Sequence, residues 1–235
     1  VRDHAAVAAT VENLPGKWKA IEVLVNNAGL SRGLAGLHDG LVSDWDEMID
    51  TKVKGLLAVD RAVVPLMVAR GRGIVIHIGS IAGRMAGGGF GPYAASKHAV
   101  SAFNWALRAE LALDTKMKSS VIEPGEIKTE IWAKGRETVA ELEGRLREAG
   151  MDDRYASLMD AQRPYLAEDS TRGVEADKVA DAVQKALTAR HPRARYLVGP
   201  DARGMGVVTR FPDRWRETLI RTNARQMARA GRKLR

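Results

Sequence analysis

GIVIHIGSIAGRMAGGGFGPYAASKHAV, residues 73–100, places a serine directly after an apolar run, and then a tyrosine and a lysine four positions apart. The apolar run is typical of a buried parallel strand, which ends at Ser80. The tyrosine and lysine fall at the start of the helix predicted to follow. Residues four apart on a helix lie on one face, so Tyr93 and Lys97 are expected to be neighbours.

These three side chains suit proton transfer to a carbonyl or from an alcohol. A free phenol loses its proton at a pKa of about 10. The ammonium group of Lys97 would lower the pKa of the Tyr93 phenol, which could then exchange a proton near neutral pH. Ser80 can hydrogen-bond the same reacting oxygen. None of the three supplies a hydride, so a cofactor would have to.

Strands and long helices alternate along the chain. This pattern favours an α/β protein with a parallel sheet covered on both faces. Ligands of such sheets bind at the carboxyl ends of the strands, where these motifs fall. The expected strands are Ile21–Asn26, Gly73–Gly79, Ser119–Gly125 and Arg195–Gly199, and the expected long helices are Trp45–Ala69 (with Ser43 as N-cap), Pro92–Leu113 and residues 174–190.

Four motifs carry a resemblance to a known family: NNAG (26–29), GSIAG (79–83), YAASK (93–97) and EPGEIKT (123–129). With this set, the chain resembles the short-chain dehydrogenase/reductase family from its first residue to about Gly199. The resemblance implies a Rossmann-type doubly wound parallel sheet flanked by helices. It also implies an NAD(P)-dependent oxidoreductase that interconverts a secondary alcohol and a ketone.

The resemblance assigns roles to single residues. Ser80 would orient the substrate oxygen, Tyr93 would be the general acid/base, and Lys97 would support it and bind the nicotinamide ribose. The cofactor would be NAD or NADP, and a homodimer or homotetramer would form through the two long helices. The implied cofactor-binding residues are Val1, Asn26, Ala28 and Gly29 at the adenosine end, Tyr93 and Lys97 at the ribose, and Pro124, Gly125, Ile127 and Thr129 at the nicotinamide end.

Lys52 departs from the family pattern, which commonly has an asparagine three residues before Gly55 as part of the proton relay. A buried lysine there would depress the pKa of Lys97, and could act as a substitute donor in the catalytic group. Alternatively, Lys52 would extend outward and leave the relay incomplete. The second possibility keeps open a non-catalytic family member that serves as a binding or regulatory protein.

The family's glycine-rich cofactor turn is not found in this sequence, and residues 83–91 lack its spacing. The glycines of residues 83–91 are instead expected to form a flexible lip over the site. We expect a fragment that lacks the first three strands of the family fold and binds dinucleotide weakly. The strand Ile21–Asn26 would then be an exposed apolar edge.

The chain is expected to divide into a partial catalytic domain, residues 1–200, and a basic helical extension, residues 201–235. Residues 130–172 would form a substrate lid, whose apolar residues either line a pocket for a lipophilic substrate or pack a helical cover. These apolar residues are Ile131, Trp132, Met151, Tyr155, Leu158, Met159, Pro164 and Tyr165.

Charge and composition exclude several other functions. The net charge is +8, and most of it lies in residues 201–235, which have nine Arg and one Lys against three acids. This favours a solvated C-terminal helix over contact with a membrane surface, and argues against nucleic-acid binding. There is no Cys, and the five His lack ligand spacing, so no metal site is expected. A cytoplasmic location is predicted.

Overall fold

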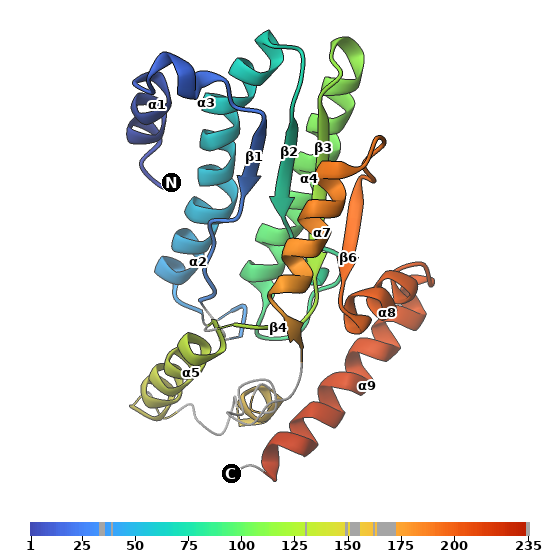
Figure 1. Ribbon diagram of the computed structural model, residues 1–235. Helices are drawn as coiled ribbons and strands as arrows, with labels where there is room; N and C mark the ends of the chain where they lie inside the picture. The colour runs from blue at the N-terminus through green and yellow to red at the C-terminus, as the bar shows by residue number, and fades with distance from the viewer. Residues whose placement is uncertain are drawn as a thin grey trace.

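The computed structural model describes residues 1–32, 36–38, 40–129, 131–148, 150, 156–161, 163 and 173–233. Its main sheet has four parallel strands in the order β1-β2-β3-β6 (Figure 1). The strands are β1 (Val23–Asn26), β2 (Ile74–Ile78), β3 (Lys118–Pro124) and β6 (Arg195–Val198). The register pairs Val25 with Ile76, Ile76 with Ser120, and Val121 with Arg195. The α/β class and the parallel sheet are confirmed.

Helices cover both faces of this sheet (Figure 1). On one face, Ile74 and Ile76 pack against Ala182 and Ala186 of α7 (Asp177–Thr188). On the other, Val75 packs with Met67 and Leu111. The helices of this second face are α3 (Gly55–Ala69), against which α1 (His4–Glu12) also packs, and α4 (Gly91–Asp114). The alternation along β2 is that of a strand buried on both faces.

Several element boundaries differ from the sequence prediction. The helix expected from Trp45 begins at Val42, with Leu41 rather than Ser43 as N-cap. It is divided into α2 (Val42–Ile49), a π-helical turn η2 (Asp50–Lys54) and α3. The sequence prediction did not include this π-helical turn, in which the hydrogen bonds join residues five apart.

The structure of two further segments was not predicted from the sequence. Val1 to Asp3 form no regular element, and Asp3 caps α1 by accepting a hydrogen bond from the Ala6 amide at 2.9 Å. Val174–Glu175, predicted as helix, forms strand β5, which pairs with β4 (Ile127–Lys128). The remaining elements are η1 (Gly16–Lys19), η3 (Ile81–Gly83), α5 (Ile131–Glu148), α8 (Pro200–Val208) and α9 (Asp213–Arg232), and residues 156–161 are also helical.

β1 is an edge strand of the main sheet, as predicted. Val23 and Val25 are 44% and 43% exposed, and no strand of the described residues pairs with their outer side. None of the helices in the described ranges combines the length and apolar character that crossing a bilayer requires.

Candidate active site

Ser80 and Tyr93 are brought together where β2 ends and α4 begins. Ser80 is the N-cap of η3, and its Oγ accepts a hydrogen bond from the Ala82 amide at 3.1 Å. The Ser80 side chain also lies near enough to the Tyr93 phenol to lower its pKa. The turn after β2 therefore holds the serine hydroxyl against the phenol.

Lys97 lies one helical turn after Tyr93 and is almost completely buried. Its ammonium group donates a hydrogen bond to the Ile78 carbonyl at 2.8 Å, and lies 5.9 Å from the centroid of the Tyr93 ring. Burial lowers the pKa of Lys97 to about 8, because desolvation disfavours the charged form. At neutral pH the Lys97 side chain is therefore mostly a cation.

Lys52 occupies the π-helical turn η2 and is only 3% exposed, so the outward orientation is excluded. Its nitrogen lies over the face of the Tyr93 ring, 3.7 Å from the centroid. Burial first, and then repulsion by Lys97, lower the pKa of Lys52 to about 6. Burial lowers the pKa of Lys97, and burial together with repulsion from Lys97 lowers that of Lys52 further.

The pKa of the Tyr93 phenol differs from the value expected from the sequence. Burial raises its pKa above the usual value, and the Ser80 side chain opposes that change only in part. The predicted lowering by an adjacent ammonium is not found. The cost of placing a phenolate in a buried site exceeds the stabilisation that the neighbouring groups give it.

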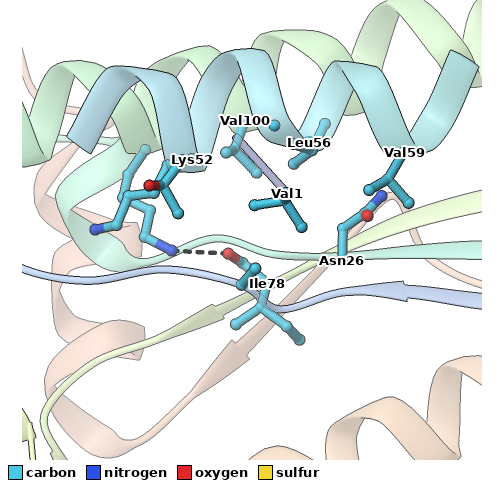
Figure 2. Close-up of a pocket in the computed structure, with 11 residues that line it drawn as sticks. Val1, Asn26, Lys52, Leu56, Val59, Ile78 and Val100 are labelled. Carbon is cyan, nitrogen blue, oxygen red and sulfur yellow. Dashed lines mark hydrogen bonds between the residues drawn. The ribbon is translucent and has the colours of Figure 1, made fainter. Parts of the chain in front are cut away.

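A small cavity adjoins the two lysines (Figure 2). Its volume of about 20 Å³ is enough for one water molecule. Gly29 borders Lys52: a Cβ there would lie 3.2 Å from the lysine Cε, so glycine leaves room for the lysine stem. The lining residues are Val1, Asn26, Ala28, Thr51, Lys52, Gly55, Leu56, Val59, Ile78, Lys97 and Val100.

Asn26 makes a contact that sequence reasoning did not foresee. Its amide donates a hydrogen bond to Asp60 Oδ1 at 2.7 Å, and Asp60 Oδ2 lies 3.1 Å from Nε2 of the fully buried His77. Within the described residues, Nδ1 of His77 has no hydrogen-bond partner. A histidine in an otherwise apolar strand was the only sequence signal for this group.

The segment expected at the nicotinamide end follows β3. Gly125 packs so closely against Asp201 that a Cβ would collide with the carboxylate, which also accepts a hydrogen bond from the Glu126 amide at 2.6 Å. Pro124 ends β3, Ile127 begins β4, and Thr129 is exposed. Asp201, in the first turn of α8, thus fixes the loop in which these residues lie.

The predicted lid is described only in part. Met151, Tyr155, Pro164, Tyr165 and the side chains of Ile131 and Trp132 lie outside the described residues. Met159 is buried, and a Cβ on Gly88 of the glycine-rich segment would lie 3.4 Å from Leu158 Cδ1. The segment expected to form a lip therefore adjoins the helical residues 156–161.

The C-terminal helix α9 is attached mainly through its last turns. Met227 and Ala228 are buried, and Gly231 packs directly on the backbone of Asp160. Trp215 and Leu219 are 58% and 45% exposed. Five arginines of this helix are exposed as well: Arg214, Arg221, Arg225, Arg229 and Arg232. No cluster of metal-ligating residues occurs in the described part of the chain.

Comparisons with known proteins agree with this geometry. The family model for short chain dehydrogenase matches residues 1–140. NADP-dependent 3-hydroxy acid dehydrogenase YdfG of Salmonella typhi is 46% identical over 125 residues, which are 53% of this chain and 50% of that protein. A Schizosaccharomyces pombe protein of the same activity name is 37% identical over 130 residues, 55% of this chain and 50% of its own. The chain thus spans about half the length of the curated relatives it matches.

Solved structures show the same fold. Serine dehydrogenase from Escherichia coli superposes with a TM-score of 0.64 at 30% identity, covering 85% of this chain and 73% of that one. A closed form of serine dehydrogenase complexed with NADP+ gives a TM-score of 0.69 at 31% identity, with the same coverage. Since the family model covers more than half of the sequence and the sheet and helices match, the chain belongs to the short-chain dehydrogenase family.

Proposed function

We propose that the protein carrying this chain is an NAD(P)-dependent oxidoreductase that interconverts a secondary alcohol and a ketone. The observation that carries the proposal is the convergence of Ser80, Tyr93 and Lys97 at the carboxyl end of β2. NADP is the favoured cofactor, because relatives are named as NADP-dependent and a similar structure holds NADP+.

The described residues fit one end of such a cofactor. Tyr93 and Lys97 supply a hydroxyl and an amine that can bind a ribose, close to the reacting oxygen. The opposite, pyrophosphate end would need backbone amides at a glycine-rich turn. The motifs of this sequence do not supply that turn, so the fit is to the nicotinamide riboside.

In the proposed mechanism, the chain positions the substrate and moves one proton. The Tyr93 hydroxyl gives its proton to the carbonyl oxygen during reduction, or takes the proton of the alcohol during oxidation. Ser80 holds the substrate oxygen beside the phenol, and the Lys97 cation stabilises the phenolate. The nicotinamide, when bound, supplies or accepts the hydride.

Lys52 has a separate part in this mechanism. With a pKa of about 6, its amine is mostly uncharged at neutral pH and can therefore accept a proton. The cavity that Lys52 and Lys97 both line has room for one water molecule, which could take part in proton transfer between the amines. We propose that Lys52 helps to restore the proton of Lys97 after each turnover.

The test is oxidation of a panel of 3-hydroxy acids and lipophilic secondary alcohols with NADP+ and NAD+, followed by nicotinamide absorbance. Tyr93→Phe should lower kcat by about 10²–10⁴-fold, the range of acid–base catalysis. Tyr196→Phe is the matched control, since its hydroxyl accepts a hydrogen bond from the Arg193 amide in another part of the fold. Equal activity of the two variants would refute the role of Tyr93.

A second candidate is a non-catalytic member of the family that binds a nucleotide or a partner. The observation in its favour is that the Lys52 amine already lies over the Tyr93 ring. Lys52→Asn separates the two proposals. A lower rate in this variant supports the relay, whereas turnover that appears only in Lys52→Asn supports the non-catalytic member.

The proposal also covers assembly and domain organisation. Leu57 of α3 and Leu113 of α4 are 42% and 79% exposed, which suits a homodimer or homotetramer formed through these helices. Residues 1–200 would act as the catalytic part, with 201–235 as an extension, in the cytoplasm. Light scattering coupled to size-exclusion chromatography of Leu57→Glu would test the interface.

A further inference from the structure

Glu123 of β3 is a fully buried carboxylate that contacts three other elements of the fold. Its Oε2 accepts a hydrogen bond from Arg84 Nε at 2.5 Å, and its Oε1 accepts one from Ser101 Oγ at 3.2 Å. Arg195 Nε lies 3.5 Å from Oε1 as an ion-pair partner. Arg84 belongs to the end of η3, Ser101 to α4 and Arg195 to β6.

A buried carboxylate is costly unless its oxygens are fully paired. Here each oxygen of Glu123 has at least one partner, and each partner comes from a different segment. Displacement of any of these segments would leave part of the negative charge buried and unpaired. The carboxylate therefore favours a single arrangement of the three segments.

Two of the partners lie close to the candidate catalytic residues. Arg84 ends the short turn that Ser80 begins, in which the Gly83 amide bonds to the Ser80 carbonyl at 2.9 Å. Ser101 lies one helical turn after Lys97 on the same face of α4. Glu123 thus joins the turn that carries Ser80 to the helix that carries the phenol.

At Gly83 the turn packs against α4 with no side chain of its own in between. A Cβ on Gly83 would lie 2.6 Å from the Lys97 carbonyl oxygen and 3.1 Å from Ser101 Oγ. At the end of β2, a Cβ on Gly79 would lie 3.4 Å from Glu123 Cγ. Close contact between glycines and backbone sets how near the segments can approach, and the Glu123 carboxylate holds them at that distance.

We propose that Glu123 is a positioning residue, which fixes the turn of Ser80 against α4 and thereby keeps the Ser80 hydroxyl beside the Tyr93 phenol. Its effect on catalysis rests on the proposed function. The position of Ser80 beside Tyr93 does not depend on cofactor or turnover, so it can be tested separately.

The experiment uses the chain with ¹³Cζ-labelled tyrosine, and Tyr93→Phe identifies the Tyr93 resonance. The Cζ shift responds to the polar surroundings of the phenol, and Ser80→Ala gives the position expected when the serine hydroxyl is no longer beside it. Glu123→Gln, which keeps the shape but removes the charge, should move the resonance at least half of the way to that position. The matched control is Glu22→Gln, because Glu22 also pairs with two arginines, Arg70 and Arg72, but at the exposed start of β1.

A Tyr93 resonance that stays at its wild-type position in folded Glu123→Gln would overturn the proposal. If that variant does not fold, Arg84→Gln provides the same test from the partly exposed side of the pair, and Arg84→Lys should return the resonance toward wild type. An equal displacement in Glu22→Gln would also count against it. If the protein proves to have no redox activity, the proposed function fails, but the resonance still decides the role of Glu123.

Where turnover is measurable, Glu123→Gln should lower kcat about tenfold with little change in KM, as expected for a misplaced hydrogen-bond donor. A general loss of stability would instead lower the amount of active protein without moving the Tyr93 resonance. The two measurements together therefore separate positioning from a merely structural role.

Discussion

The side-chain nitrogen of Lys52 lies 3.7 Å from the centroid of the Tyr93 ring, inside a site that also contains the cation of Lys97. Two amines share a region that burial makes unfavourable for charge, and Lys97 is the one that keeps its proton at neutral pH. The face of an aromatic ring is a tolerable environment for either form of the Lys52 amine. Because both amines are buried at one site and have lowered pKa values, the stability of the protein depends on pH.

Lys52→Met should stabilise the protein, and the gain should depend on pH. The pKa of Lys52 is about 6 in the folded chain and 10.5 ordinarily, so between these values the unfolded chain binds a proton that the folded chain does not. The free energy of unfolding of the wild type therefore rises with pH across this window, and the penalty is complete below pH 6. We expect a gain of about 2 kcal/mol or more at pH 7 that shrinks toward pH 10, measured by urea unfolding.

Lys54→Met is the control for this prediction. Lys54 lies two residues further on, is exposed, and pairs with Asp50 at 2.8 Å, so its replacement should not reproduce the pH-dependent gain. A gain for Lys52→Met that is constant from pH 6 to pH 9 would contradict the assigned cause.

Gly83→Ala should displace the turn that carries Ser80. Its Cβ would lie 2.6 Å from the Lys97 carbonyl oxygen, a backbone atom that cannot move without disturbing α4. We expect a loss of about 1–3 kcal/mol in the free energy of unfolding, as in other cases of overpacking. The Tyr93 resonance should move together with this loss.

Gly87→Ala makes the same chemical change a few residues later, where a Cβ would meet nothing within 4 Å. This variant should remain within about 0.5 kcal/mol of the wild type. Equal losses in the two variants would indicate that the segment responds to any methyl group rather than to the contact at Gly83.

The strands and the motif of the site could be predicted, because they depend on local pattern. Residues close together in the sequence are enough to identify the apolar run ending at Ile78 and the spacing of Tyr93 and Lys97. The state of Lys52 was not readable, since its burial depends on the room that Gly29 leaves. The same limit applies to β5, which is strand only because β4 pairs with it.

The polar groups that hold the site together were missed for a related reason. Asp60 and His77 are far apart in sequence, as are Arg84 and Glu123, and each pair is formed by the fold alone. A charged residue in a predicted helix or strand is expected to be exposed to solvent unless its partner is known. Sequence reasoning thus placed the reacting groups but not their supports.

Asp60→Ala should cost more than an ordinary loss of a surface carboxylate. It removes the acceptor of the Asn26 side-chain amide and the only hydrogen-bond partner of the His77 ring found in the described residues. Unpaired polar groups in a buried position cost about 1–3 kcal/mol, and thermal unfolding should show a loss in that range. Asp181→Ala removes an exposed carboxylate that pairs with Lys178 on α7, and is expected to be nearly neutral. A similar melting temperature for the two variants would mean that the buried pair contributes nothing.

Val25→Lys should reduce association of the isolated chain. Val25 is 43% exposed on β1, whose outer edge has no partner strand within the described residues, and an unpaired apolar edge is a template for pairing with another chain. A lysine keeps the strand but repels a second copy, so light scattering at increasing concentration should fall while the free energy of unfolding changes by less than about 0.5 kcal/mol. Val207→Lys adds the same charge at a 55% exposed position of α8, away from any sheet edge. If both variants lower scattering equally, net charge explains the effect; if only Val25→Lys does, the edge of β1 is where copies of the chain associate.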